Sequence, residues 1–409
     1  MVIGNWNKTS NGSGVFSILI NLILAKKQMN KPEIKKFLSE IIAIDTSNPP
    51  GNEGKAAYFL AVFLKDRARK IELVGKDKRK NIIAFFGNLE SENILLFNGH
   101  LDTIPFNKNE WQTNPLELTE KNGRYYGRGA ADMKGGITAS IFAILEAEEL
   151  GYLKNKQVIF AGSADEETGA GSEFGSKLIA EYLIKNKIKA RGVLIPEPSG
   201  NKKYLKINLG HRGLVWIKAR SFGEAGHAGL LRKENNSILK IQGFIQEMYG
   251  LFPKEPKKIK GIPQSSVRIT FINSGNSEHY NIIPKICEAN FDVRVSPYED
   301  NSKIISKITK IADKLGIKIS IIKNTSSSRI SKNEKIVKVF ENVLKLRKQK
   351  YKLGFASPAC DAHWYVSAGI PTINGAGPIG ENAHAPNEYI LAESLYDRID
   401  LFTELIREF

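Results

Sequence analysis

The stretch "ILLFNGHLD" (residues 94–102) runs from an apolar segment directly into a histidine and an aspartate. Two later stretches end in the same way, "VIFAGSADEE" (158–167) and "GVLIPEP" (192–198). Short apolar runs that alternate with helical periodicity predict an α/β domain with a largely parallel sheet. In open sheets of this kind, the carboxyl ends of the strands form the ligand crevice. The side chains that we expect to converge there are His100, Asp102, Glu166, Glu167 and Glu197.

The pattern of apolar and polar residues changes after about residue 205. Strands with alternating polarity, such as "KICEANFDVRVSP" (285–297), are then mixed with helical segments near 235–250 and 301–315, an order typical of a compact α+β unit. A pattern typical of an α/β domain resumes later, with an apolar run at 370–375 that predicts a buried strand. The sequence therefore predicts an α/β domain formed by residues 29–207 and 324–409, interrupted by a smaller, ferredoxin-like domain at 208–323.

The first 28 residues differ from the rest of the chain. Their apolar run "VFSILINLILA" (15–25) has 11 residues, which is too short to span a bilayer. It could be a signal-peptide core, but only Lys8 precedes it, Lys26 and Lys27 follow it, and no small-residue cleavage site is evident. We expect residues 1–28 to be an upstream extension, disordered or loosely helical, and we expect no stable membrane insertion.

The composition excludes some classes of function. The net charge of +17 comes from 60 Lys and Arg against 43 Asp and Glu, but the basic residues are scattered and lack the interleaved aromatics of a nucleic-acid platform. Attraction of an anionic substrate or partner is therefore favoured over nucleic-acid binding. The two cysteines, Cys287 and Cys360, are too few for a disulfide framework or a Cys-rich zinc site. We expect a cytoplasmic protein in which His, Asp and Glu hold any metal.

Further candidate ligands lie outside the strand ends. Asp132 lies in the Gly-rich turn "GRGAADMKGG" (127–136), and His384 lies in the loop "GENAHAPNE" (380–388). Taken singly, a helix N-cap, a core imidazole or a surface acid explains each residue. Together, several buried carboxylates would cost several kcal/mol per charge unless cations compensated for them. A His/carboxylate site for paired metal ions accounts for all of them.

Five motifs carry a resemblance to a known family: "GHLDT", "GRGAADMKGG", "DEETG", "EPSG" and "NAHAPNE", in this order. From Met29 to the C-terminus the chain resembles the acetylornithine deacetylase and succinyl-diaminopimelate desuccinylase group of two-metal aminoacylases and peptidases. The resemblance implies a zinc-peptidase-like catalytic domain, a lid and dimerisation domain, and a homodimer.

The resemblance also implies roles for single residues. His100, Asp132 and Glu197 would hold one zinc ion, and Asp132, Glu167 and His384 would hold the other, with Asp132 bridging. Cobalt or manganese would also suit such ligands. Glu166 would be the general base and acid, and the carboxylate of Asp102 would orient the ring of His100.

The implied lid residues are less firmly marked in the sequence. His227, in "GEAGHAG" (223–229), would reach across the dimer to stabilise the tetrahedral oxyanion, although a polar loop histidine would look the same. Arg212, Asn281 and Arg294 would bind a substrate carboxylate or scaffold the lid, although basic residues on strands are more often solvated.

The chain departs from the family pattern at one place. His363 stands where many relatives carry arginine, after Pro358 and Ala359 in place of a Gly-rich approach, which puts the acyl or side-chain pocket in doubt. Cys360 is expected to be a packed residue, while His211 and His279 are expected to be structural or exposed.

We therefore expect a metal-dependent amidohydrolase that removes an acetyl or succinyl group from a small amino acid such as ornithine, lysine or diaminopimelate. The alternative with the same chemistry is a carboxypeptidase, dipeptidase or broad aminoacylase. A catalytically silent homologue or binding module is disfavoured, because every ligand and the base are present.

Overall fold

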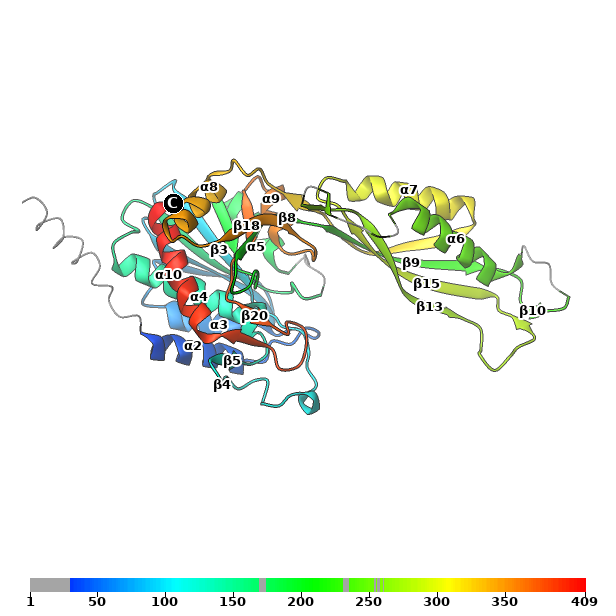
Figure 1. Cartoon of the computed structure of the whole chain (residues 1–409), viewed down its shortest axis with the longest axis horizontal. Coiled ribbons are helices and arrows are strands. Elements are labelled where there is room, and N and C mark those ends of the chain that lie inside the picture. The colour runs from blue at the N-terminus through cyan, green and yellow to red at the C-terminus, as the bar shows by residue number, and fades with distance from the viewer. Residues whose placement is uncertain (1–29, 169–173, 231–234, 254, 256–257, 260) are drawn as a thin grey trace, which may run out of the picture.

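The computed structural model describes residues 30–409 except 169–173, 231–234, 254, 256–257 and 260. The predicted extension at residues 1–28 lies outside the described residues. Figure 1 shows an elongated molecule, with a broad α/β lobe at one end and an arm of long strands at the other. No helix in the described part of the chain is long and apolar enough to cross a membrane.

A nine-stranded sheet forms the centre of the α/β lobe, in the order β1-β2-β6-β3-β7-β19-β8-β17, with β18 paired to β8. The strands are β1 (Lys70–Lys76), β2 (Arg79–Gly87), β3 (Ile94–His100), β6 (Gln157–Ser163), β7 (Gly192–Ile195), β8 (Leu205–His211), β17 (Ser328–Arg329), β18 (Tyr351–Ala356) and β19 (Thr372–Gly375). The four strands in the middle, β6-β3-β7-β19, pair in parallel, while β1, β2 and β17 pair antiparallel at the flanks. The predicted α/β class is confirmed.

Helices cover both faces of this sheet, as expected for parallel strands that are buried throughout. One face packs against α2, α3, α4, α8 and α10, and the other against α5 and α9. Their bounds are α2 (Lys31–Ala43), α3 (Glu53–Leu64), α4 (Gly135–Glu149), α5 (Ser176–Lys185), α8 (Lys335–Leu346), α9 (Ala362–Ser367) and α10 (Ala392–Glu408). Successive side chains of a strand point to opposite faces of the sheet. In β2, Ile82 and Phe86 pack in the core with α2, α3, α4, α8 and α10, whereas Ile83 and Phe85 pack in the core with α5 and α9.

The arm is a four-stranded antiparallel sheet in the order β13-β15-β9-β16, covered on one face by α6 and α7. The chain order is β9 (Gly213–Phe222), α6 (Ser237–Leu251), β13 (Ser266–Ser274), β15 (Ile286–Val295), α7 (Asn301–Lys314) and β16 (Ile317–Thr325). This βαββαβ order is the predicted ferredoxin-like arrangement. The predicted boundaries at 207/208 and 323/324 fall inside β8 and β16, and the division into two domains remains our proposal.

Small sheets complete the fold. In one, β10 (Gly226–His227) pairs with β14 (Ile282–Ile283) at the tip of the arm. In another, β20, β21, β5 and β4 form an antiparallel sheet beside α2. Its strands are β4 (Thr119–Lys121), β5 (Arg124–Tyr126), β20 (Gly380–Glu381) and β21 (Tyr389–Leu391), and the remaining pair is β11 (Lys258–Ile259) with β12 (Ile262–Pro263).

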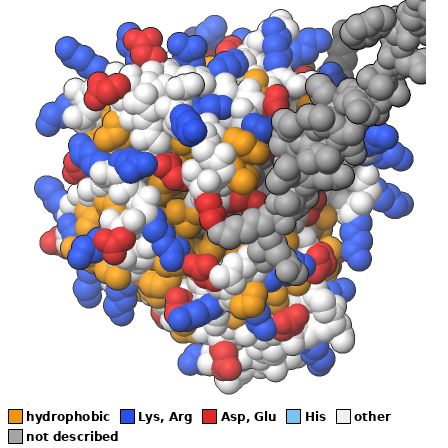
Figure 2. All heavy atoms as spheres, turned by 90° about the vertical axis from the view of Figure 1, so that its left-hand side faces the viewer, with side chains coloured by type: hydrophobic (Ala, Val, Ile, Leu, Met, Phe, Trp, Pro, Cys, Tyr) orange, Lys and Arg blue, Asp and Glu red, His pale blue; other side chains and the backbone are white. Residues whose placement is uncertain are grey.

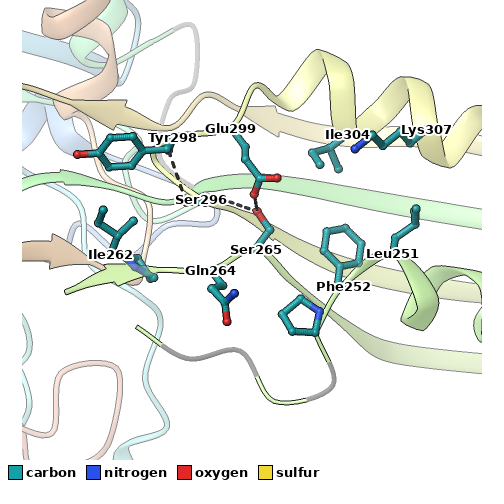
Figure 3. A pocket seen from close by; sticks show the side chains of 12 residues that line it. Leu251, Phe252, Ile262, Gln264, Ser265, Ser296, Tyr298, Glu299, Ile304 and Lys307 are labelled. Carbon is teal, nitrogen blue, oxygen red and sulfur yellow. Dashed lines mark hydrogen bonds between the residues drawn. The ribbon is translucent and has the colours of Figure 1, made fainter. Parts of the chain in front are cut away.

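One end of the α/β lobe and a cavity of the arm lie away from the strand ends. Figure 2 shows the end of the α/β lobe, where Lys and Arg side chains lie among acidic and apolar ones. A cavity of about 390 Å³ lies at the base of the arm, where Ser265 hydrogen-bonds Glu299 (Figure 3). None of the predicted metal ligands lines this cavity.

Candidate metal centre

The parallel register of β3 and β6 brings the motifs "GHLDT" and "DEETG" together. His100 lies opposite Ser163, so the acidic turn that follows β6 begins beside the imidazole. Glu197 follows β7, the next neighbour of β3. Asp132 comes from the irregular helical turn Ala130–Lys134 that precedes α4. His384 comes from the loop between β20 and β21.

These side chains form two groups that share one member. The ligand atoms of His100, Asp132 and Glu197 all lie within 4.8 Å of one another, as do those of Asp132, Glu167 and His384. The two oxygens of Asp132 face different partners: Oδ1 lies 2.9 Å from His100 Nε2, and Oδ2 lies 3.3 Å from His384 Nε2. Asp132 therefore has the orientation of a bridging ligand.

The spacing of the donor atoms fits divalent metal ions. Two ligands held about 2.1 Å from a tetrahedral zinc ion lie about 3.4 Å from each other. His384 Nε2 lies 2.9 Å from Glu167 Oε2, and His100 Nε2 lies 3.7 Å from Glu197 Oε1. Small side-chain adjustments would bring both groups to ligand distances.

The carboxylates of the site also need positive charge near them, because several lie close together and are shielded from water. Desolvation, with nearby carboxylates adding to it, raises the pKa of Glu166 and Glu197 well above their usual range. Hydrogen bonds with Asp132 and Glu167 raise the pKa of His384 to about 10. The carboxylates of the site thus favour positive charge beside them, which a divalent ion supplies in a His/carboxylate site.

Asp102 holds the acidic turn rather than only the ring of His100. Its carboxylate accepts hydrogen bonds from the backbone N–H of Glu166 (3.1 Å) and of Glu167 (2.9 Å). His100 Nδ1 lies 3.0 Å from the Asp102 carbonyl oxygen and 3.5 Å from its carboxylate. The backbone carbonyl is thus the nearer partner of the ring, and the carboxylate makes a second, longer contact with it.

Glu388 was not among the predicted site residues, although it ends the "NAHAPNE" motif. It is fully buried and accepts hydrogen bonds from the N–H groups of Gly129, Ala131 and Asp132, at 3.0, 2.8 and 2.9 Å. Arg128 Nη1 lies 2.7 Å from the same carboxylate. Glu388 thereby fixes the turn that presents Asp132.

The predicted lid residues do not join the metal ligands within the chain. His227 lies in β10 at the tip of the arm, and the N–H of Ala228 donates to the carbonyl of Asn281 (2.9 Å) beside it. Arg212 and Arg294 lie at the base of the arm, where they line a pocket together with Arg268, a residue that sequence reasoning missed. No sequence signal distinguished Arg268 from other strand arginines.

His363 is buried, whereas Pro358 before it is exposed and Ala359 is partly exposed. Desolvation lowers the pKa of His363 to about 4 and that of His211 to about 3, and the two rings meet edge to face at 5.8 Å. His363 is therefore neutral near pH 7 and supplies no positive charge at this position. Cys360 is buried and receives a hydrogen bond from Asn374, and burial raises its thiol pKa, as expected for a packed residue.

This fold and this donor set define a metal-dependent hydrolase that acts on amide bonds. The chain belongs to peptidase family M20/M25/M40, whose model matches residues 96–408. It is 28% identical over 394 residues to the succinyl-diaminopimelate desuccinylase of Rickettsia typhi, covering 91% of this chain and 98% of that protein. It is also 28% identical to the acetylornithine deacetylase of Pasteurella multocida, covering 84% of this chain and 87% of the relative.

Solved structures share the fold. An M20 metallo-carboxypeptidase from Sulfolobus solfataricus superposes with a TM-score of 0.77 at 23% identity, covering 92% of this chain and 98% of that one. A dinuclear metal-binding peptidase of the family from Bacillus subtilis gives a TM-score of 0.66 at 15% identity, covering 92% of this chain and 97% of that one.

Proposed function

We propose that this protein is a two-metal deacylase that removes an acetyl or succinyl group from the amine of an amino acid such as ornithine, lysine or diaminopimelate. The observation that carries the proposal is Glu166 beside two ligand groups that share Asp132. The names of these two relatives, succinyl-diaminopimelate desuccinylase and acetylornithine deacetylase, support an N-acyl amino acid substrate.

The proposed metals are two zinc ions, with cobalt or manganese as possible replacements, held by His100, Asp132, Glu167, Glu197 and His384. Bound at these residues, the ions would lower the pKa of water and polarise the amide carbonyl. Glu166 takes the proton of the attacking water and returns it to the leaving amine. Its raised pKa suits a group that must be both base and acid. Asp102 keeps Glu166 in place through the backbone N–H.

The position of His227 supports a homodimer. The oxyanion that develops on the amide carbonyl needs a donor, and His227 lies at the far tip of its own chain. We therefore assign it to the site of a second copy. The two cysteines are buried and form no disulfide, which supports the proposed reducing, cytoplasmic setting.

Complementation between two inactive variants tests this arrangement. We expect Glu166→Gln and His227→Ala to be inactive alone, whereas mixed dimers have one complete site each. A statistical mixture of the co-expressed chains should then recover about a quarter of wild-type activity. Mixed dimers without activity, or a His227→Ala protein with full turnover, would contradict the role of His227.

The basic pocket that Arg212, Arg268 and Arg294 line supports an anionic substrate. It has a volume of about 570 Å³ and includes Arg212, Arg268 and Arg294. Asp292 is the only carboxylate among its described lining residues, and it lies 2.7 and 3.0 Å from Arg294. No carboxylate of the described residues forms an ion pair with Arg212 or Arg268, so the three arginines of the pocket outnumber Asp292 and leave it net positive.

Arg268 tests the substrate role of this pocket. In Arg268→Gln we expect KM for an N-succinyl amino acid to rise about tenfold with kcat little changed, because one charge-assisted hydrogen bond is lost. Arg220→Gln, which removes an exposed arginine paired with Glu288, is the control. An unchanged KM would show that the substrate does not reach Arg268.

A substrate panel tests the function itself. The proteins named among the structural neighbours include peptidases, so the panel should contain acetylornithine, succinyl-diaminopimelate, simple N-acyl amino acids and dipeptides. We expect the highest kcat/KM for an N-acyl amino acid. Cleavage of dipeptides alone would replace the proposal by a peptidase.

A further inference from the structure

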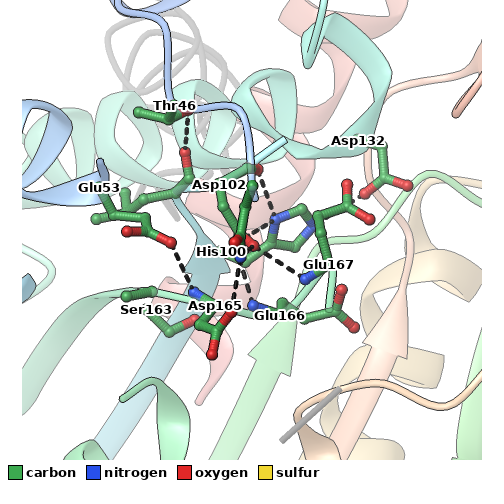
Figure 4. A network of polar contacts seen from close by, with 12 residues as sticks. Thr46, Glu53, His100, Asp102, Asp132, Ser163, Asp165, Glu166 and Glu167 are labelled. Carbon is green, nitrogen blue, oxygen red and sulfur yellow. Dashed lines mark hydrogen bonds and ion pairs between the residues drawn. The ribbon is translucent and has the colours of Figure 1, made fainter. Parts of the chain in front are cut away.

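A second acidic cluster lies behind the acidic turn, on the side away from the metal ligands. It consists of Glu53, Asp102 and Asp165, which are all buried and whose oxygens lie within 4.8 Å of one another. They come from the first turn of α3, the end of β3 and the end of β6 (Figure 4). Burial, with the charge of Asp102 adding to it, raises the pKa of Glu53 to about 7. Such a cluster needs a cation to be stable.

That cation is Arg79, the first residue of β2. Its Nε lies 2.9 Å from Glu53 Oε2, and its Nη2 lies 2.5 Å from Asp165 Oδ1. Its Nη1 also donates to the carbonyl of Pro50 at 3.1 Å. Gly51 makes room for the guanidinium, because a Cβ at that position would lie 2.2 Å from Arg79 Nη1. The guanidinium forms ion pairs with two carboxylates at once through different nitrogens, an arrangement that a single ammonium nitrogen does not reproduce.

The cluster is connected to the catalytic turn by further hydrogen bonds. Glu53 accepts the N–H of Asp165 at 3.1 Å, so Asp165 is held at both its backbone and its side chain. Asn48 bridges Asp165 and Asp102, donating to them at 2.6 and 2.8 Å. Asp165 has a φ of 57°, a left-handed conformation that a non-glycine residue keeps only when its surroundings hold it. Glu166 and Glu167 follow immediately.

We propose that Arg79 is a positioning residue: by clamping Glu53 and Asp165, its guanidinium fixes the turn that aims Glu166 and Glu167. The inference rests on the proposed function for its effect on turnover, but its effect on metal binding does not depend on the substrate. The three carboxylates are not a third metal site in this account, because Arg79 already forms ion pairs with Glu53 and Asp165.

Cobalt(II) binding and turnover together test the role of Arg79. In Arg79→Gln we expect the affinity of metal-depleted protein for cobalt(II), measured by calorimetry, to fall about 10- to 100-fold. We expect kcat to fall by a similar factor while KM stays within about twofold, because the residue aims catalytic groups without touching the substrate. The control is Arg69→Gln, which breaks an exposed ion pair with Glu148 and should change neither quantity.

Two further variants separate positioning from general stability. In Arg79→Lys we expect a partial recovery, because an ammonium serves one carboxylate well. In the double variant Arg79→Gln/Glu53→Gln we expect kcat and cobalt affinity to rise above those of Arg79→Gln, since one uncompensated charge is removed. A double variant no better than the single one would overturn the electrostatic clamp.

The remaining outcomes are also decisive. Wild-type cobalt affinity and kcat in folded Arg79→Gln would overturn the proposal. If Arg79→Gln does not fold, the Arg79→Lys protein decides the question. Wild-type cobalt(II) affinity and kcat in Arg79→Lys would show that a guanidinium paired with two carboxylates is not needed. If the wild-type protein cleaves no N-acyl amino acid, the deacylase proposal fails, while the cobalt titration still decides the role of Arg79.

Discussion

A Glu166→Gln protein is expected to lose hydrolysis about 10²- to 10⁴-fold while it keeps both metal ions. Glutamine retains the size of the side chain and the backbone N–H that Asp102 holds, but it cannot carry the proton of the attacking water to the leaving amine. The rate of amine release and the metal content of the purified protein measure the two halves of this prediction.

The control for Glu166 is Glu181→Gln, an exposed acid on α5 that should leave both quantities unchanged. Undiminished hydrolysis in Glu166→Gln would break the proposed mechanism. A loss of hydrolysis accompanied by loss of metal would instead make Glu166 a ligand.

An Asp132→Ala protein is expected to hold less than about one metal ion per chain and to be inactive, because one carboxylate serves both ligand groups. Removing Glu197 or His384 takes one ligand from one group, whereas removing Asp132 takes one from each. Elemental analysis after equilibration with zinc and desalting measures the content.

The comparison for Asp132 is Glu197→Ala, which should weaken one ion more than the other. Two ions retained by Asp132→Ala would show that the carboxylate does not bridge. Activity restored to this variant by excess zinc would show that its role is affinity alone.

The strand ends were predictable because they depend on two simple regularities. Buried parallel strands read as apolar runs, and their carboxyl ends meet at one edge, so His100, Glu167 and Glu197 could be grouped before any coordinates. Asp132 and His384 could be named as candidate ligands from their motifs, but only the family resemblance assigned them to particular ions, since neither directly follows a strand of the central sheet. Both come from turns, where sequence periodicity gives no position in space.

The supporting residues could not be predicted for a different reason. Glu53 looks like an ordinary acid in the first turn of a helix, and Arg79 looks like a solvated strand end. Their contact depends on how α3, β2 and the turn after β6 pack together. The same holds for Glu388, which ends a motif but acts through its contact with backbone N–H groups of a turn about 260 residues away in sequence.

The arm shows that alternating polarity does not always predict which side chains of a strand are buried. Strand β15 alternates strictly between buried and partly exposed residues, as its sequence predicts, but β13 does not, because its pairing shifts between Ile269 and Phe271. A shift of this kind changes which face a side chain occupies. Arg268 precedes this shift and pairs with Asp292, and its place in the basic pocket depends on the packing of distant segments, which the sequence pattern does not reveal.

Asp102 and Glu388 both bind the amide groups of ligand-bearing turns, and neither is itself a proposed metal ligand. The shape of the centre is thus encoded by contacts that persist when the ions are removed. Metal uptake should then cost little chain ordering, unlike that of small zinc domains that fold only around their ion. Chelation should empty this centre reversibly, and the far-ultraviolet circular dichroism of the protein should not change.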